Sequence, residues 1–135
     1  MKVATEIWVA AALLHKEHPE RNDFGVAEIV SRAVEENLGG GYRPGLHIHA
    51  SSHCVANKQP CPAQHRMLFE TARGRRRLFR SGDPYHPYRE RGKVRPERAE
   101  VPQNYIHLIE WYDKAYSQKG GKKRREKKPR RGKRL

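Results

Sequence analysis

The sequence predicts a mainly helical α+β domain with one small β-hairpin, followed by a polybasic segment. Apolar residues recur at helical spacing in the first half, and the period becomes strand-like on both sides of Gly74. The charge is graded along the 135 residues: −1 over 1–64, +5 over 65–118 and +10 over 119–135. We therefore expect one folded domain over 1–118, a common domain size, and a disordered tail over 119–135, where like charges repel and apolar residues are scarce.

Two helices are expected first. Residues 4–17 carry an apolar stripe and end at His18-Pro19, because the residue before proline disfavours the α region. Residues 26–38 form the clearest helix, with Gly25 as its N-cap and Phe24 packing on Ile29 as a hydrophobic staple. Its apolar face comprises Val26, Ile29, Val30, Ala33, Val34 and Leu38, and the glycines at 39–41 stop it.

A third helix is expected over residues 44–56, because Pro44 suits the first helical position. Its predicted inward side chains are Leu46, Ile48, Ser52 and Val55. Its predicted outward polar side chains are His47, His49, Ser51, His53 and Lys58. The next elements are two strands, 66–71 and 76–80, around a turn at 72–75 whose tip is crowded by Arg73, Arg75, Arg76 and Arg77.

Residues 81–102 are rich in Gly, Pro and charge, and are expected to form a surface loop. Residues 103–117 form a last helix, whose apolar positions are Tyr105, Leu108, Ile109, Tyr112 and Tyr116. Its simplest role is to pack on the core, and a homodimer contact is the alternative.

Three helices followed by a basic hairpin is the order of a winged helix-turn-helix. Over about residues 3–80, the block ALLHKEHPERNDFGVAEIVSRAVEENL, the glycine break, the helix from Pro44 and the hairpin MLFETARGRRRLFR resemble the HARE-HTH-like winged-helix modules of microbial proteins. RRRLFRSGDPYHPYR followed by ERGKVRPERAEVPQNYIHLIEWYDKAY resembles the end of an uncharacterised family of such domains. The resemblance implies a fold more than a function.

Such a helix fits the major groove of DNA. His47, His49, Ser51, His53 and Lys58 would then reach base edges. The hairpin arginines Arg73, Arg75, Arg76 and Arg77 would lie beside a minor groove or a row of phosphates, and Arg43 would meet a phosphate. The helix has no Arg, and no Asn or Gln before Asn57, so it is short of residues that discriminate bases strongly.

The net charge of +14 and pI of about 10.2 make a polyanion the expected partner, with duplex DNA favoured over RNA and an anionic membrane a weaker alternative. The tail residues expected on phosphates are Lys122, Lys123, Arg124, Arg125, Lys127, Lys128, Arg130 and Arg131. If about six of them engaged duplex DNA, log K would fall with log[salt] at a slope of about −5. A solubilising tail, or a signal read by a transport receptor, is the alternative for this segment.

The sequence gives weaker evidence on the cellular location of the protein and on metal binding. No apolar run is long enough to span a bilayer and no signal peptide is evident, so we expect a cytoplasmic, or in a microbe nucleoid-associated, protein. Two cysteines cannot build a disulfide framework. The weak candidates for a zinc site are His49, His53, Cys54, Cys61 and His65, whose spacing matches no zinc motif, and we expect no cofactor.

We expect no enzymatic activity. Cys54 beside His53 attracts notice, and Asp83, His86 and Glu97 could build a small metal-dependent nuclease, but a turn capped by Asp83 explains that segment as well. The expected function is a small transcriptional regulator or architectural protein on duplex DNA. The alternatives are an RNA- or ribosome-associated protein, a protein-interaction adaptor and the nuclease. A positive third-helix face would favour DNA, and a neutral one would favour the adaptor.

Overall fold

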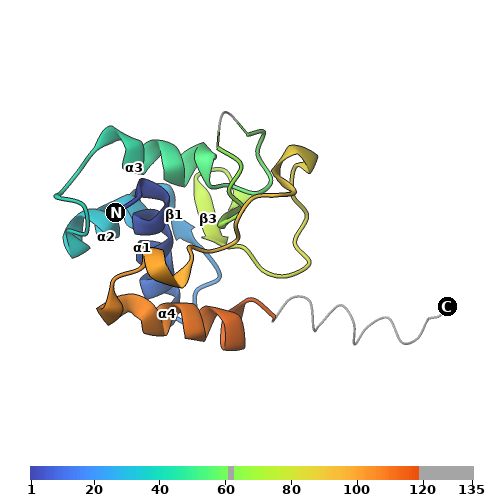
Figure 1. Ribbon diagram of the computed structural model, residues 1–135. Coiled ribbons are helices and arrows are strands. Elements are labelled where there is room, and N and C mark those ends of the chain that lie inside the picture. Colours follow the sequence, from blue (N-terminus) through green and yellow to red (C-terminus); the bar gives the residue numbers. More distant parts are fainter. Residues whose placement is uncertain (61–62, 119–135) are drawn as a thin grey trace.

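The computed structural model describes residues 1–60 and 63–118, so the tail expected to be disordered, 119–135, lies outside the described residues. The described part is α+β, as predicted, with four α-helices and a three-stranded antiparallel sheet (Figure 1). The elements run α1 (Val3–Glu17), β1 (Phe24–Gly25), α2 (Val26–Glu36), α3 (Pro44–Ile48), β2 (Leu68–Ala72), β3 (Arg75–Leu78) and α4 (Ile106–Trp111). None of the described helices is long and apolar enough to cross a membrane.

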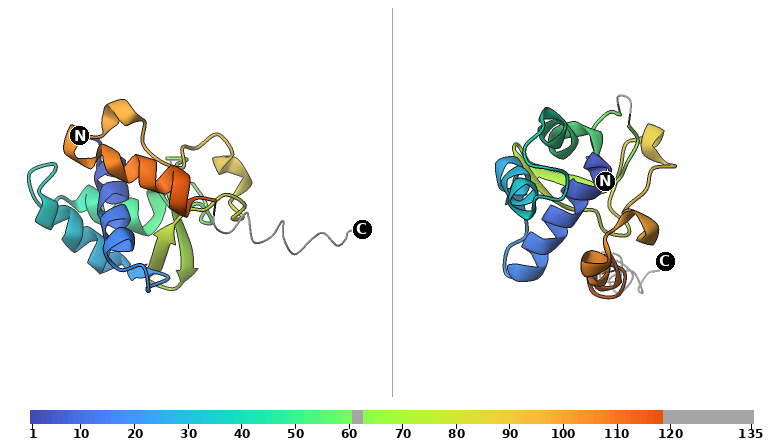
Figure 2. Two further views of the ribbon diagram at one scale, coloured as in Figure 1. Left: turned by 90° about the horizontal axis from the view of Figure 1, so that it is seen from below. Right: turned by 60° about the vertical axis from the view of Figure 1, so that its left-hand side comes forward.

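Helix α1 is the central element of the core. Ile7, Trp8 and Val9 are fully buried, and so is most of the rest of the helix, because other elements surround it. Figure 2 shows α4 crossing α1 on one side while α2 packs along another. The Trp8 ring meets the Tyr112 ring edge-on, with 5.7 Å between the centroids. The prediction of a first helix over residues 4–17 is confirmed to within one residue.

Helix α2 begins as predicted and ends earlier. Gly25 is its N-cap, and the Gly25 N–H donates to the Glu28 carboxylate at 2.8 Å. The predicted end at Leu38 is wrong, because Asn37 adopts the left-handed conformation (φ 55°) and its N–H bonds the carbonyls of the last turn. Asparagine tolerates this conformation better than most residues, so the helix stops before the three glycines.

The third helix consists of α3 and the π-helical turn η1 (His49–His53) that continues it. Pro44 is its first residue, as predicted. The predicted end at residue 56 is wrong: Val55 forms a bridge with Leu68, and the Ala56 N–H donates to the Leu68 carbonyl at 2.7 Å. That pairing with β2 takes the chain out of the helix.

The inward face of the third helix also differs from the prediction. Leu46 and Ala50 are completely buried, while Ile48, which was predicted to face inward, is 44% exposed. Ser52, also predicted inward, is only partly buried. His49 was predicted to face solvent and is instead half-buried. Residues four apart share a helix face, so the Leu46–Ala50 row excludes Ile48 from the core.

The sheet contains one strand that was not predicted. The order is β1-β3-β2, with Phe24 opposite Arg76 and Leu68 opposite Leu78. Phe24 is fully buried, but it also lies in β1 and pairs with β3. The predicted hydrophobic staple on Ile29 therefore covers only part of the role of Phe24. The hairpin strands are shorter than predicted, and Gly74 takes the positive φ of 75° that their turn requires.

The segment after the hairpin is ordered by short helical turns, η2 (Pro87–Arg89) and η3 (Arg98–Glu100). The predicted last helix is present as a continuous run of η4 (Gln103–Tyr105), α4 and the π-helical turn η5 (Tyr112–Tyr116). The Tyr116 hydroxyl donates to the Leu78 carbonyl at 3.0 Å, and Tyr112 bonds the Phe79 carbonyl likewise. The expected core-packing role is confirmed: Leu108, Ile109, Tyr112 and Tyr116 of the predicted apolar positions are buried within the chain, and Tyr105 is partly buried.

Candidate nucleic-acid interface

The exposed face of the third helix is neutral. His47 is exposed, and Ser51, Ser52 and His53 are partly exposed; residues 44–57 include no lysine or arginine. Two larger side chains are also open to solvent: Tyr42, just before the helix, is 60% exposed, and Ile48, at the end of α3, is 44% exposed. This surface offers neutral hydrogen-bonding groups and some apolar area, but no cation.

Among the described residues, most of the helix and hairpin arginines predicted to contact phosphates are engaged within the fold. Arg43 pairs with the buried Glu6 carboxylate and also bonds the Gly39 carbonyl. Arg75 pairs with Asp23 at 2.8 Å. Their charges are therefore already compensated near the helix and the hairpin.

Only Arg73, of the four hairpin arginines, lies in the turn itself, and the expectation of four arginines at the tip is corrected accordingly. Arg76 is 3% exposed and donates to the carbonyls of Ala50 and Ser51 at the end of the third helix. Its burial follows from strand alternation, because Arg76 shares a face with the buried Leu78. Arg77 pairs with Asp83 at 2.8 and 3.0 Å.

Arg73 is exposed and has no hydrogen-bond or ion-pair partner within residues 1–60 and 63–118. Lys58, predicted to face DNA, lies 3.5 Å from the Glu70 carboxylate, and the neighbouring Asn57 bonds the Glu70 backbone twice. Among the helix and hairpin residues predicted to contact DNA, Arg73 at the hairpin tip is therefore the one cation without a partner in the described part of the chain.

The histidines and Cys54 do come together, around the end of the third helix. His49 Nδ1 lies 3.4 Å from Cys54 Sγ, and the His49 ring centroid is 4.9 Å from that of His53 and 6.5 Å from that of His65. Burial, with the nearby His53 and His65, lowers the pKa of His49 to about 4. The described residues contain no His, Cys, Asp or Glu group arranged to hold a metal ion, and Cys61 lies outside them.

Neither of the catalytic candidates is arranged as an activated group. Burial raises the pKa of the Cys54 thiol to about 12, which is the reverse of what a nucleophilic cysteine needs. The Asp83 carboxylate accepts from Arg77 and from the Arg80 N–H at 2.8 Å, so its expected role as a turn cap is confirmed. His86 Nδ1 accepts from the Tyr88 N–H at 3.2 Å and so caps the start of η2.

Arg89 is a residue that the sequence did not single out. Its side chain is fully buried and faces backbone carbonyls rather than a carboxylate. It donates to the carbonyls of Ser52 (2.8 Å), His53 (2.9 Å), Lys58 (2.7 Å) and His65 (2.6 Å), and more distantly Gln59. Burial lowers its pKa. Arg76 and Arg89 together bind the carbonyl end of the third helix and fix its direction relative to the sheet.

No protein-family model matches this sequence, and no curated protein or solved structure matches it either. The resemblance to winged-helix modules therefore gains no support from relatives.

Proposed function

We propose that this chain binds double-stranded DNA as a winged-helix protein. The order α1-β1-α2-α3-β2-β3, with the sheet order β1-β3-β2, is the observation that carries the proposal. In that architecture α2 and the third helix form the helix-turn-helix, and the β2–β3 hairpin is the wing. The hairpin extends at one edge of the molecule (Figure 2), where a wing needs to be if it is to reach along a duplex.

In the proposed complex the third helix enters the major groove. His47 and Ser51 offer hydrogen bonds to base edges, and Arg73 meets a phosphate or the minor groove. Neutral histidine and serine discriminate bases more weakly than bidentate arginine or asparagine. An architectural protein is therefore favoured over a regulator that reads a long sequence.

The affinity is assigned mainly to residues 119–135, which carry 11 Lys+Arg and one acidic residue. Residues 1–118 carry 18 Lys+Arg against 14 Asp+Glu, and ion pairs within the fold engage many of them. Counterion release by the basic segment is independent of sequence. The folded part then sets the position on the duplex more than the strength of binding.

Fluorescence anisotropy on a labelled 16-bp duplex over a series of salt concentrations tests the proposal. Replacing the six cations at positions 122–125 and 127–128 with Gln should flatten the slope of log K against log[salt] by about 5. Arg73→Ala should flatten it by about 1, and Lys114→Ala, an exposed cation on the last helix, should leave it unchanged. Equal slopes for the Arg73 and Lys114 variants would remove the hairpin from the interface.

A second candidate function, a protein-interaction adaptor, is favoured by the neutral face of the third helix, which is the result expected for an adaptor, and by two exposed side chains, Tyr42 just before the helix and Ile48 on it. In that case Ile48→Glu would leave the affinity for DNA unchanged and abolish capture of a protein partner. A weaker DNA affinity in Ile48→Glu would favour the groove-binding function, because the new carboxylate would face phosphates.

A further inference from the structure

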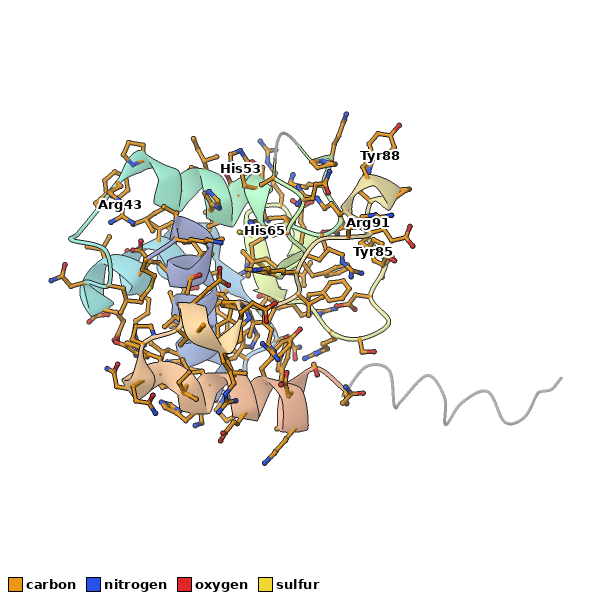
Figure 3. All side chains as sticks on the ribbon, viewed as in Figure 1. Arg43, His53, His65, Tyr85, Tyr88 and Arg91 are labelled. Carbon is orange, nitrogen blue, oxygen red and sulfur yellow. The ribbon has the colours of Figure 1, made fainter. Side chains whose placement is uncertain are left out.

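Exposed aromatic rings gather on the turn around η2, far from the third-helix start. Tyr88 is 71% exposed and Tyr85 is 37% exposed, and the His86 ring lies 5.2 Å from the Tyr88 ring. Figure 3 shows Tyr85, Tyr88 and Arg91 at one end of the molecule, with Tyr88 pointing outward and Arg43 at the opposite end. We name Tyr85, His86, Tyr88 and Arg91 the aromatic ledge.

The aromatic ledge is held by buried contacts. Between its rings, Arg89 anchors the turn through four backbone carbonyls that belong to three segments of the chain. The His86 N–H donates to the Ala56 carbonyl at 2.8 Å. Gly92 packs so tightly that a Cβ there would lie 1.6 Å from the Gln64 carbonyl oxygen. The rings are therefore presented on a fixed backbone, and little ordering is required when a ligand stacks on them.

Cations accompany the rings. Arg91 is exposed and has no partner among the described side chains, while the Arg66 guanidinium lies over the Tyr85 ring at 4.3 Å from its centroid. Beside Tyr85 is a hollow of about 720 Å³. Its lining carries three cations (Arg66, Lys93 and Arg95), three carboxylates (Asp83, Glu97 and Asp113) and Gln118. The stretch with 11 Lys+Arg follows Gln118 directly in the sequence.

We propose that the aromatic ledge binds single-stranded nucleic acid, with bases stacking on Tyr88 and Tyr85 and a phosphate on Arg91. Bases in a duplex are stacked on one another and cannot cover a protruding ring, whereas unpaired bases can. The net charge of +14 favours a polyanion over a peptide as the occupant. These rings lie at the opposite end of the molecule from Arg43 and the start of the third helix (Figure 3), and the site shares with the proposed duplex function only the basic segment 119–135.

The test compares the full chain and its variants at 0.15 M salt on three labelled probes: a 12-nucleotide oligo-U, a 12-nucleotide oligo-dT and a 16-bp duplex. Tyr88→Ala should weaken binding to both single strands about 5- to 150-fold, and Tyr88→Phe should retain it. The matched control is Tyr42→Ala, which removes a tyrosine of similar exposure near the third helix. It should change single-strand binding less than twofold. Circular dichroism checks that each variant is folded.

Affinity for the duplex is read separately, so that the two proposals fail separately. Tyr88→Ala should leave duplex binding within twofold of wild type. The proposed single-strand site would be overturned if Tyr88→Ala and Tyr42→Ala lost equal affinity for the single strands. It would also be overturned if Tyr88→Ala lost as much affinity for the duplex as for the single strands. Loss of the Arg73 effect on the duplex would overturn the winged-helix function alone. A larger Tyr88 effect on oligo-U than on oligo-dT would identify RNA as the ligand, and the reverse would identify DNA.

Discussion

Replacing Arg89 with Ala should destabilise the fold more than any substitution of a surface arginine. Four of its hydrogen bonds to carbonyls are 2.9 Å or shorter, and they join the end of the third helix to residues 58 and 65. Arg89→Ala leaves those carbonyls without their donor in the interior of the protein. The substitution thus separates three segments that no other buried side chain joins in this way among the described residues.

The magnitude follows from opposing terms. Hydrogen bonds to a charged donor contribute about 1.5–3 kcal/mol each, so four bonds contribute roughly 6–12 kcal/mol before other terms. Arg89 is fully buried without a carboxylate beside it, so removing it also recovers several kcal/mol of desolvation free energy. We expect a net loss of about 3–5 kcal/mol in the free energy of unfolding, a large part of the typical total of about 5–15 kcal/mol.

Urea unfolding followed by circular dichroism measures this difference. Arg91→Ala, two residues away and exposed, is the matched control and should change stability by less than about 0.5 kcal/mol. Arg89→Lys should recover only part of the loss, because an ammonium group cannot reproduce the planar set of donors. A loss below about 1 kcal/mol in Arg89→Ala would refute the anchoring role.

Three further predictions concern the buried parts of the fold. Gly92→Ala should destabilise by about 3 kcal/mol because its Cβ would meet a carbonyl oxygen at 1.6 Å, whereas Gly45→Ala, with its nearest contact at 3.7 Å, should be tolerated; thermal melts compare them. NMR titration of His49 should give a midpoint near 4 instead of 6.5. The unfolded chain takes up that proton first, so stability should fall as pH drops from 6.5 towards 4, and less so in His49→Gln. Cys54 should resist alkylation at pH 8 until urea is added; rapid native modification, seen by peptide mass mapping, would contradict its burial.

The helices could be predicted because their signal is local. In α2, Ile29, Val30 and Ala33 mark one face within a single stretch of chain, and the structure buries them all. The third helix was harder because its core row relies on the small residue Ala50, whereas Ile48 is apolar and exposed. The apolar periodicity favoured burial of the larger side chain, Ile48. The packing of the helix against neighbouring elements buries Ala50 instead and leaves Ile48 exposed.

The candidate site was less predictable, since the fate of a cation depends on distant partners. The burial of Arg76 could have been inferred, because residues two apart in a strand share a face and Leu78 is a core residue. The partners of Arg75 and Arg89 lie tens of residues away, in Asp23 and in the carbonyls around residue 53. No spacing along the chain indicates such contacts, and β1, with two residues, is too short to give a period at all.

The contact between Trp8 and Tyr112 has a consequence for the order in which the protein is made. Trp8 leaves the ribosome about 100 residues before Tyr112, which at about 5–20 residues per second is a delay of roughly 5–20 s. During that interval one side of α1 has no final partner, so a chain stopped before residue 103 should expose Trp8 to solvent. Limited proteolysis of ribosome-stalled chains should find α1 cleavable until the last helix has emerged, which makes the nascent protein a candidate for chaperone binding.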